Sequence, residues 1–277
     1  VVQDRENKSL DNFLELAFLR YRPNRHWALR AGRINSDLYL LSEYPYVGYA
    51  YLWVRPPHEY YAFASTAAHY DGMDIEYSNN VSDGYLRVKL ATGKTTPNLS
   101  IDNEDFSITF EDLFTLSAVY VKDEWTWRAS SSKANVSEFE SDKLAALIMN
   151  LKAMPTSLWP QATEFAHGLD SQYHKITYSA LGVTYDDFDW LIQAEVSAAN
   201  TDWLLVPSNI TGYVSVGYRV NDVTYFTGLS AVENKNEIPQ VNIPELSDNL
   251  PVELKIGTLQ LVAATESALQ RAVVHQY

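Results

Sequence analysis

The sequence has 277 residues and a formal net charge of −14 at pH 7, an acidic excess that argues against a nucleic-acid partner. It contains no cysteine, which excludes disulfides, thiolate metal sites and cysteine nucleophiles. No run of about 18 apolar residues occurs, so no transmembrane helix is predicted; a membrane β-barrel needs no such run, because its lipid and lumen faces alternate.

Five pairs of segments alternate apolar and polar residues with a period of two, and a short polar turn joins the two members of each pair. This pattern predicts five antiparallel β-hairpins. The predicted strands cover residues 14–21 and 27–31, 73–78 and 85–92, 114–120 and 125–131, 177–185 and 190–197, and 211–218 and 223–230. Because long connections separate the pairs, short turns gather at one end of the strands and long loops at the other, as in outer-membrane barrels.

One long connection contains a predicted helix, segment 141–154, which has helical spacing, a Ser-Asp start suited to capping and Pro155 after it. At the ends of the chain, residues 1–5 look like the end of a strand followed by a polar turn. Residues 270–277 look like the beginning of another strand. We therefore expect that the native product extends beyond both ends and that this chain lacks strands there.

The stretch 30–61 is a long, tyrosine-rich and largely apolar segment that carries acidic side chains. A loop of this length is usually functional or disordered, and this one has too few small polar residues for disorder. We predict that it folds back into a barrel interior, where its acids face a basic wall. An ordinary packed loop on a soluble domain is the alternative. The residues predicted to form this constriction are Arg30, Arg33, Asp37, Glu43, Arg87, Lys89 and Arg128.

Ring side chains flank each short turn. Tyrosine and tryptophan prefer a membrane–water interface, where one end of the side chain is apolar and the other is wet. The residues assigned to this aromatic girdle are Trp27, Tyr77, Tyr120, Trp125, Tyr185, Trp190, Tyr218 and Tyr225. The alternative is a general preference of rings for strands, which would scatter them along the strands instead of gathering them at one end.

These features carry a family resemblance. Segments 10–23, 29–57, 70–77 and 177–196 contain an arginine-rich strand pair followed by the long tyrosine-rich loop, and they resemble Gram-negative outer-membrane porins, especially the porin-like proteins of gammaproteobacteria. The resemblance implies a single all-β domain over residues 1–277. Its fold would be an antiparallel transmembrane up-and-down β-barrel with short periplasmic turns, long extracellular loops and an inward-folded constriction loop. The strand number departs from the family, because the five hairpins give ten predicted strands, whereas about 16 would be usual for a porin.

The resemblance also implies a function. Such a protein is a homotrimeric, water-filled channel in the bacterial outer membrane for passive diffusion of small hydrophilic solutes and ions. Its partners are outer-membrane lipid and lipopolysaccharide, with no nucleic acid. It implies no enzymatic activity, no catalytic residues, no cofactor and no metal.

Two alternatives stay open. One is an outer-membrane barrel hydrolase. The sequence contains no Gly-x-Ser-x-Gly elbow and no glycine-rich phosphate loop, and its six histidines lack metal-binding spacing. A Ser-His-Asp triad, however, is assembled in space and leaves no fixed spacing. The other alternative is a soluble, aromatic-rich carbohydrate-binding β-sandwich.

Overall fold

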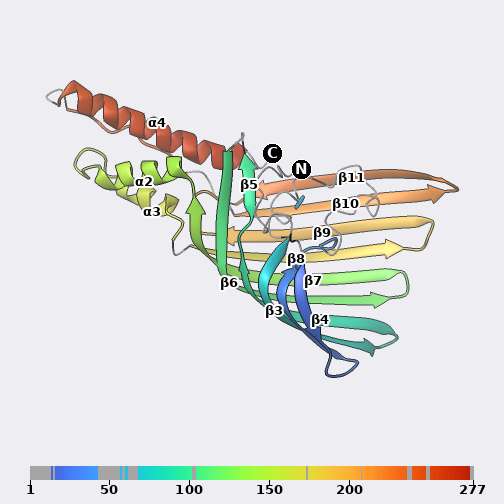
Figure 1. Ribbon diagram of the computed structural model, residues 1–277. Helices are drawn as coiled ribbons and strands as arrows, with labels where there is room; N and C mark the ends of the chain where they lie inside the picture. The colour runs from blue at the N-terminus through green and yellow to red at the C-terminus, as the bar shows by residue number, and fades with distance from the viewer. Residues whose placement is uncertain are drawn as a thin grey trace.

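The computed structural model describes residues 14, 16–42, 57, 60–61, 68–101, 104–172, 174–206, 208–235, 239–247 and 250–274. Within them the chain forms one antiparallel sheet (Figure 1). Its strands are β1 Ala17–Tyr21, β2 Trp27–Asn35, β3 His69–Val81, β4 Gly84–Thr95, β5 Asn98–Ile101, β6 Glu104–Lys122, β7 Trp125–Glu140, β8 Lys175–Asp186, β9 Trp190–Thr201, β10 Asn209–Val220 and β11 Val223–Asn234.

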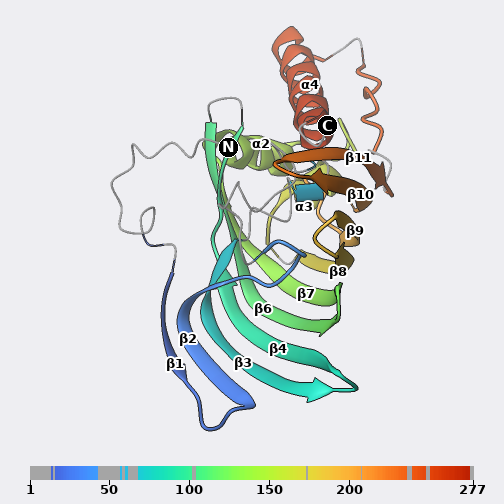
Figure 2. The same ribbon diagram turned by 90° about the vertical axis from the view of Figure 1, so that its right-hand side faces the viewer.

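The strands follow an up-and-down order, β1-β2-β3-β4-β6-β7-β8-β9-β10-β11, with the short β5 paired to β6 beside this path. All five predicted hairpins are confirmed, and most strands run further toward the loop end than the alternation predicted. The carbohydrate-binding sandwich is wrong, because the described strands form one sheet and not two stacked sheets. Figure 2 shows this sheet curved into a trough with β1 and β11 at its two edges. Closure into a barrel stays a prediction.

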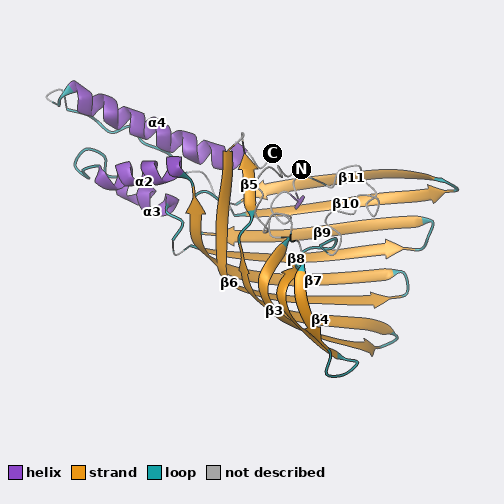
Figure 3. Cartoon of the chain, in the orientation of Figure 1, coloured by secondary structure: helices purple, strands orange, loops and turns teal. Residues whose placement is uncertain are grey.

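The β3–β4 hairpin turn shows why the chain reverses so tightly. In the β3–β4 turn Val81 pairs with Gly84, and the two central residues, Ser82 and Asp83, have φ of 50° and 63°. Two-residue turns with positive φ match the right-handed twist of the strands that they join. The short turns lie together at one end of the sheet, and the helices lie at the opposite end (Figures 1 and 3). This is the asymmetry that the sequence predicted.

The exposed, convex face of the trough is apolar, whereas the exposed face of a sheet in a water-soluble protein is polar. On the convex face large apolar side chains are exposed, among them Met73 at 59%, Leu181 at 61% and Leu229 at 78%. On the concave face apolar side chains such as Ile34, Tyr70 and Tyr178 are buried, and polar or charged side chains are buried beside them. The buried polar and charged side chains of this face include Asp74, Lys89, Thr115, Ser117, Arg128, Ser130, Gln193, Glu195, Ser197, Thr211 and Ser215.

A line of glycines runs across three neighbouring strands on the concave side. Gly32 of β2 pairs with Gly72 of β3, which pairs with Gly93 of β4. A Cβ on Gly72 would lie against the backbone of Thr92 and Gly93, and one on Gly93 would lie against the backbone of Asp71. Side chains would therefore separate these strands, and glycine lets them approach closely at this level of the sheet.

Three helices pack together at the loop end: α2 Asp142–Ala153, α3 Ala162–Leu169 and α4 Val252–Val274. The predicted helix at 141–154 is confirmed, with the Ser141 hydroxyl accepting from the Leu144 amide. The predicted strand beginning at residue 270 is wrong, because α4 continues through Val274. Buried positions Thr258, Leu261, Val262, Thr265 and Leu269 of α4 recur at helical spacing, a stronger signal than the short alternation near the end of the chain.

Among the described residues, none of the helices is both long enough and apolar enough to cross a membrane.

Candidate functional site

The chain leaves β2 and turns onto the concave face of the trough. Residues 36–42 lie there, together with Tyr60 and Tyr61 further along the same connection, and most of their side chains are buried. A backbone hydrogen bond of 2.9 Å from the Ser36 amide to the Ala68 carbonyl brings the two ends of this connection together. We call these described residues the inward loop.

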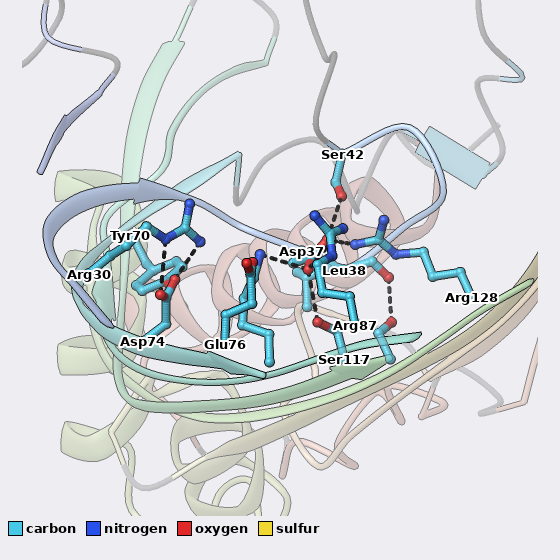
Figure 4. A network of polar contacts seen from close by, with 12 residues as sticks. Arg30, Asp37, Leu38, Ser42, Tyr70, Asp74, Glu76, Arg87, Ser117 and Arg128 are labelled. Carbon is cyan, nitrogen blue, oxygen red and sulfur yellow. Dashed lines mark hydrogen bonds and ion pairs between the residues drawn. The ribbon is translucent and has the colours of Figure 1, made fainter. Parts of the chain in front are cut away.

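Asp37 is the charged side chain among the described residues of the inward loop, and several side chains of the sheet contact it. Its carboxylate lies 2.8 Å from Lys89 Nζ, contacts the Arg128 guanidinium and lies 4.0 Å from that of Arg87 (Figure 4). The Ser117 hydroxyl also donates to it at 2.9 Å. Asp37 is only 4% exposed. One buried carboxylate therefore meets three cations from β4 and β7, which leaves a local excess of positive charge on the wall.

The neighbouring Leu38 fixes the loop to the wall through its backbone. Its carbonyl accepts a 2.5 Å hydrogen bond from the hydroxyl of Ser130 on β7 (Figure 4). The contacts of Asp37 and Leu38 together reach β4, β6 and β7. The beginning of the inward loop is therefore held against the middle of the sheet.

A second anchor lies on the far side of the inward loop, at Glu195 of β9. Its carboxylate accepts hydrogen bonds from the Leu40 amide at 2.5 Å and from the hydroxyls of Tyr61 and Tyr213, each at 2.9 Å. Gly182, directly opposite on β8, leaves space for this side chain, since a Cβ there would lie 3.0 Å from the Glu195 Cγ.

Tyrosine rings surround this carboxylate. The ring centroids of Tyr60 and Tyr213 are 5.1 Å apart, and those of Tyr39 and Tyr61 are 5.2 Å apart, both in edge-to-face geometry. Burial and the charge of Glu195 raise the pKa of the Tyr61 hydroxyl, so this hydroxyl stays protonated and donates. The tyrosine-rich composition of the stretch thus supplies both the packing and the hydrogen-bond donors of the anchor.

The predicted constriction residues fall into two groups. The structure brings Asp37, Arg87, Lys89 and Arg128 together. Arg30 is also on the concave face, but it pairs with Asp74 of the adjacent strand at 3.0 and 2.6 Å and not with Asp37 (Figure 4).

Arg33 is a correction. It has the strand parity of Leu29 and Ala31, so it belongs to the convex face, where both of its bonds to Asp71 are 2.8 Å long. Glu43 lies outside the described residues. Sequence reasoning did not single out Glu195 as an anchor, although the alternation of β9 places it on the polar face with Gln193.

The predicted girdle residues meet as cross-strand neighbours at the short-turn end. Trp27 packs on Tyr77 with 4.9 Å between ring centroids, Trp125 on Tyr185 with 4.8 Å, and Trp190 on Tyr218 with 4.5 Å. Tyr218 also pairs in register with Tyr225. The ring of Tyr120 stacks on that of Trp127, with 5.7 Å between their centroids. The predicted girdle omitted Trp127 because this residue lies two positions inside β7.

No protein-family model matches the chain, and no curated protein matches it. Among solved structures, the chain is weakly similar to the outer-membrane expressed OmpT of Vibrio cholerae. That similarity has a TM-score of 0.34 and 9% sequence identity, and it covers 78% of this chain and 70% of that chain. So low a similarity supports no functional assignment by itself.

Proposed function

We propose that the chain forms a β-barrel of the bacterial outer membrane and acts as a porin, a water-filled channel for passive diffusion of small hydrophilic solutes and ions. The observation that carries this proposal is the polarity of the sheet, which exposes large apolar side chains on its convex face and holds its buried charged side chains on its concave face. A soluble protein rarely exposes a continuous apolar surface of more than a few hundred Å². Hydrocarbon against the convex face and water against the concave face would satisfy both surfaces.

The aromatic pairs support this orientation. They gather next to the short turns, where the apolar band of the convex face ends, as at Trp125 and Tyr185. Amphipathic rings are enriched at the level of the lipid headgroups. The short turns would then face the periplasm, and the helices and long connections would face outward.

The inward loop favours a channel over a barrel that serves only as a membrane anchor. It lies against β4, β6, β7, β9 and β10, and it brings the acidic Asp37 onto a basic wall. Charged side chains that line a water-filled passage orient polar solutes and ions without holding them tightly. In this proposal Asp37, Arg87, Lys89 and Arg128 form the constriction, and three chains associate in the membrane.

The pairing of His174 with Asp202 gives the hydrolase alternative no support. The His174 ring, which pairs with Asp202 at 3.1 Å, uses its other nitrogen toward the His167 carbonyl at 3.4 Å. This ring is therefore engaged in local structure at the loop end, and no serine hydroxyl in the described part of the chain is bonded to it.

Conductance tests the proposal. The protein, folded in detergent micelles, is added to planar lipid bilayers, and we expect stepwise current increments of uniform size that grow in proportion to salt concentration. Cross-linking in the same micelles tests the trimer. A protein that stays monodisperse in plain buffer and gives no conductance steps would refute both the channel and the lipid-facing surface.

A further inference from the structure

The inward loop covers only part of the concave face. Its buried contacts reach from β4 to β10, whereas a groove of about 660 Å³ stays open over β1 to β4 and the β1–β2 turn. This groove begins beside Asp37 and extends to the short-turn end, where Arg22 and Arg25 line it. It is therefore the open part of the proposed passage.

The groove is basic although the protein is strongly acidic. Among the described residues, its lining contains six cationic side chains and two carboxylates. The cations are Arg20, Arg22, Arg25, Arg30, Arg87 and Lys89, and the carboxylates are Asp37 and Glu76. Since the whole chain carries −14, this concentration of positive charge is local and specific to the groove.

Most of these cations at the constriction end already have a carboxylate beside them. Arg30 pairs with Asp74, and Lys89 pairs with Asp37. Arg20 lies 3.4 Å from Glu76. Arg87 and Arg128 share the Asp37 carboxylate with Lys89, so part of the unoffset positive charge lies at the constriction and the rest lies toward the short-turn end.

Arg22 and Arg25 differ from those cations. Both are exposed in the β1–β2 turn. Arg25 Nε is 3.0 Å from a ring nitrogen of His26, and neither guanidinium has a carboxylate in contact among the described residues. Two such guanidinium groups at the mouth of a groove are available to a mobile anion.

We infer that this groove selects small anions carrying a carboxylate or phosphate group, with Arg22 and Arg25 as the residues that attract them at the short-turn end. A guanidinium presents parallel N–H donors that match a carboxylate or phosphate in two-point geometry. Because both arginines are solvated, each contact is weak, and the anion leaves as readily as it enters. The inference rests on the proposed channel, and it adds the class of solute.

The absence of cysteine allows a test that does not require conductance. Ser78 lines the groove, so Ser78→Cys introduces a single thiol there. We compare its rate of reaction with a negatively charged and a positively charged methanethiosulfonate reagent, using the full chain in micelles. The control is Thr224→Cys, at an exposed β11 position outside the groove. The ratio of the negative reagent's rate to the positive reagent's rate should be higher at residue 78 than at residue 224. Adding Arg22→Gln and Arg25→Gln should abolish that preference at residue 78 and leave residue 224 unchanged.

The labelling of residue 78 is then repeated in acetate and in inorganic phosphate, each at the ionic strength of a chloride reference. The rate of the negative reagent in each solution shows which anion competes with it. Reversal potentials in a potassium chloride gradient should show anion preference that Arg22→Gln with Arg25→Gln reduces. Arg219→Gln, at an arginine near the end of β10 that pairs with Asp186 outside the groove, should not change it. Conductance without these effects would overturn the anion groove and leave the channel intact. Charge-dependent labelling without conductance would support the groove and overturn the channel.

Discussion

Tyr61 and Glu195 lie 134 residues apart in the chain, yet the Tyr61 hydroxyl donates a 2.9 Å hydrogen bond to the Glu195 carboxylate. The Leu40 amide donates to the same carboxylate from the other part of the inward loop. One side chain on β9 therefore holds both described parts of the inward loop against the sheet. The position of the loop, and with it the width of the proposed passage, depends on this contact.

Glu195→Ala should release the inward loop. The substitution leaves the Leu40 amide and the Tyr61 and Tyr213 hydroxyls without their acceptor, and each buried unsatisfied donor costs about 1–3 kcal/mol. We expect larger and noisier single-channel currents and faster proteolysis of the loop in the folded protein. The companion variant Tyr213→Phe removes one donor and should have a smaller effect in the same direction. Unchanged current and unchanged proteolysis for Glu195→Ala would contradict the anchor.

The alternation of side chains predicted the sheet because each strand separates two different environments. In segment 85–92 the alternation puts Leu86, Val88 and Leu90 on one face and Lys89 on the other, and the structure places Lys89 on the concave side and Leu90 on the exposed side. The regular pattern fades toward the loop end, where the strands continue but no longer separate an apolar surface from a polar one. Strand ends there could not be read from alternation.

The site could be predicted only in part. Asp37 could be predicted because an acid in a tyrosine-rich, largely apolar loop is visible in the sequence. The cations of β4 and β7 could be predicted because the alternation places them on the same face of their strands. The partner of Arg30 was not, because Asp74 lies across a strand pair whose register depends on a connection of more than thirty residues. The partners of Glu195 were not predicted for the same reason, since two of its donors, the Leu40 amide and the Tyr61 hydroxyl, come from the inward loop.

Asp37→Asn should both destabilise the protein and increase its preference for anions. The substitution leaves Lys89 and Arg128 buried without their shared carboxylate, and loss of one partner from a buried ion pair typically costs about 3–5 kcal/mol. Denaturant unfolding in micelles measures the stability, and reversal potentials measure the selectivity. The double variant Asp37→Asn with Lys89→Gln removes one acid and one base, so it should regain part of the lost stability. A double variant as unstable as the sum of its single variants would show that the two side chains are not coupled.

Leu90→Lys should prevent stable insertion into a bilayer. Leu90 lies in the middle of β4 on the convex face, opposite Ile75 and Leu116, and a lysine facing lipid at mid-depth costs about 2–4 kcal/mol. The matched control is Ser78→Lys, which adds the same charge on the neighbouring strand but within the groove. We expect reduced folding yield into lipid vesicles for the first variant and near-normal yield for the second. Equal yields would argue that the convex face does not contact lipid.

Gly72→Ala tests whether the close approach of the strands along the line of glycines depends on glycine. A Cβ at residue 72 meets the backbone of Thr92 and Gly93, which belongs to a paired strand and not to a flexible side-chain end. The strands must separate to accept it, and overpacking of this kind costs about 1–3 kcal/mol. Gly257→Ala is the control, because a Cβ at that position of α4 has no atom within 4 Å. Since alanine favours a helix over glycine by about 0.8–1.0 kcal/mol, Gly257→Ala should be neutral or slightly stabilising. Denaturant midpoints of the two variants measure the difference, and a Gly72→Ala midpoint equal to or above that of the unchanged protein would show that the close approach does not depend on glycine.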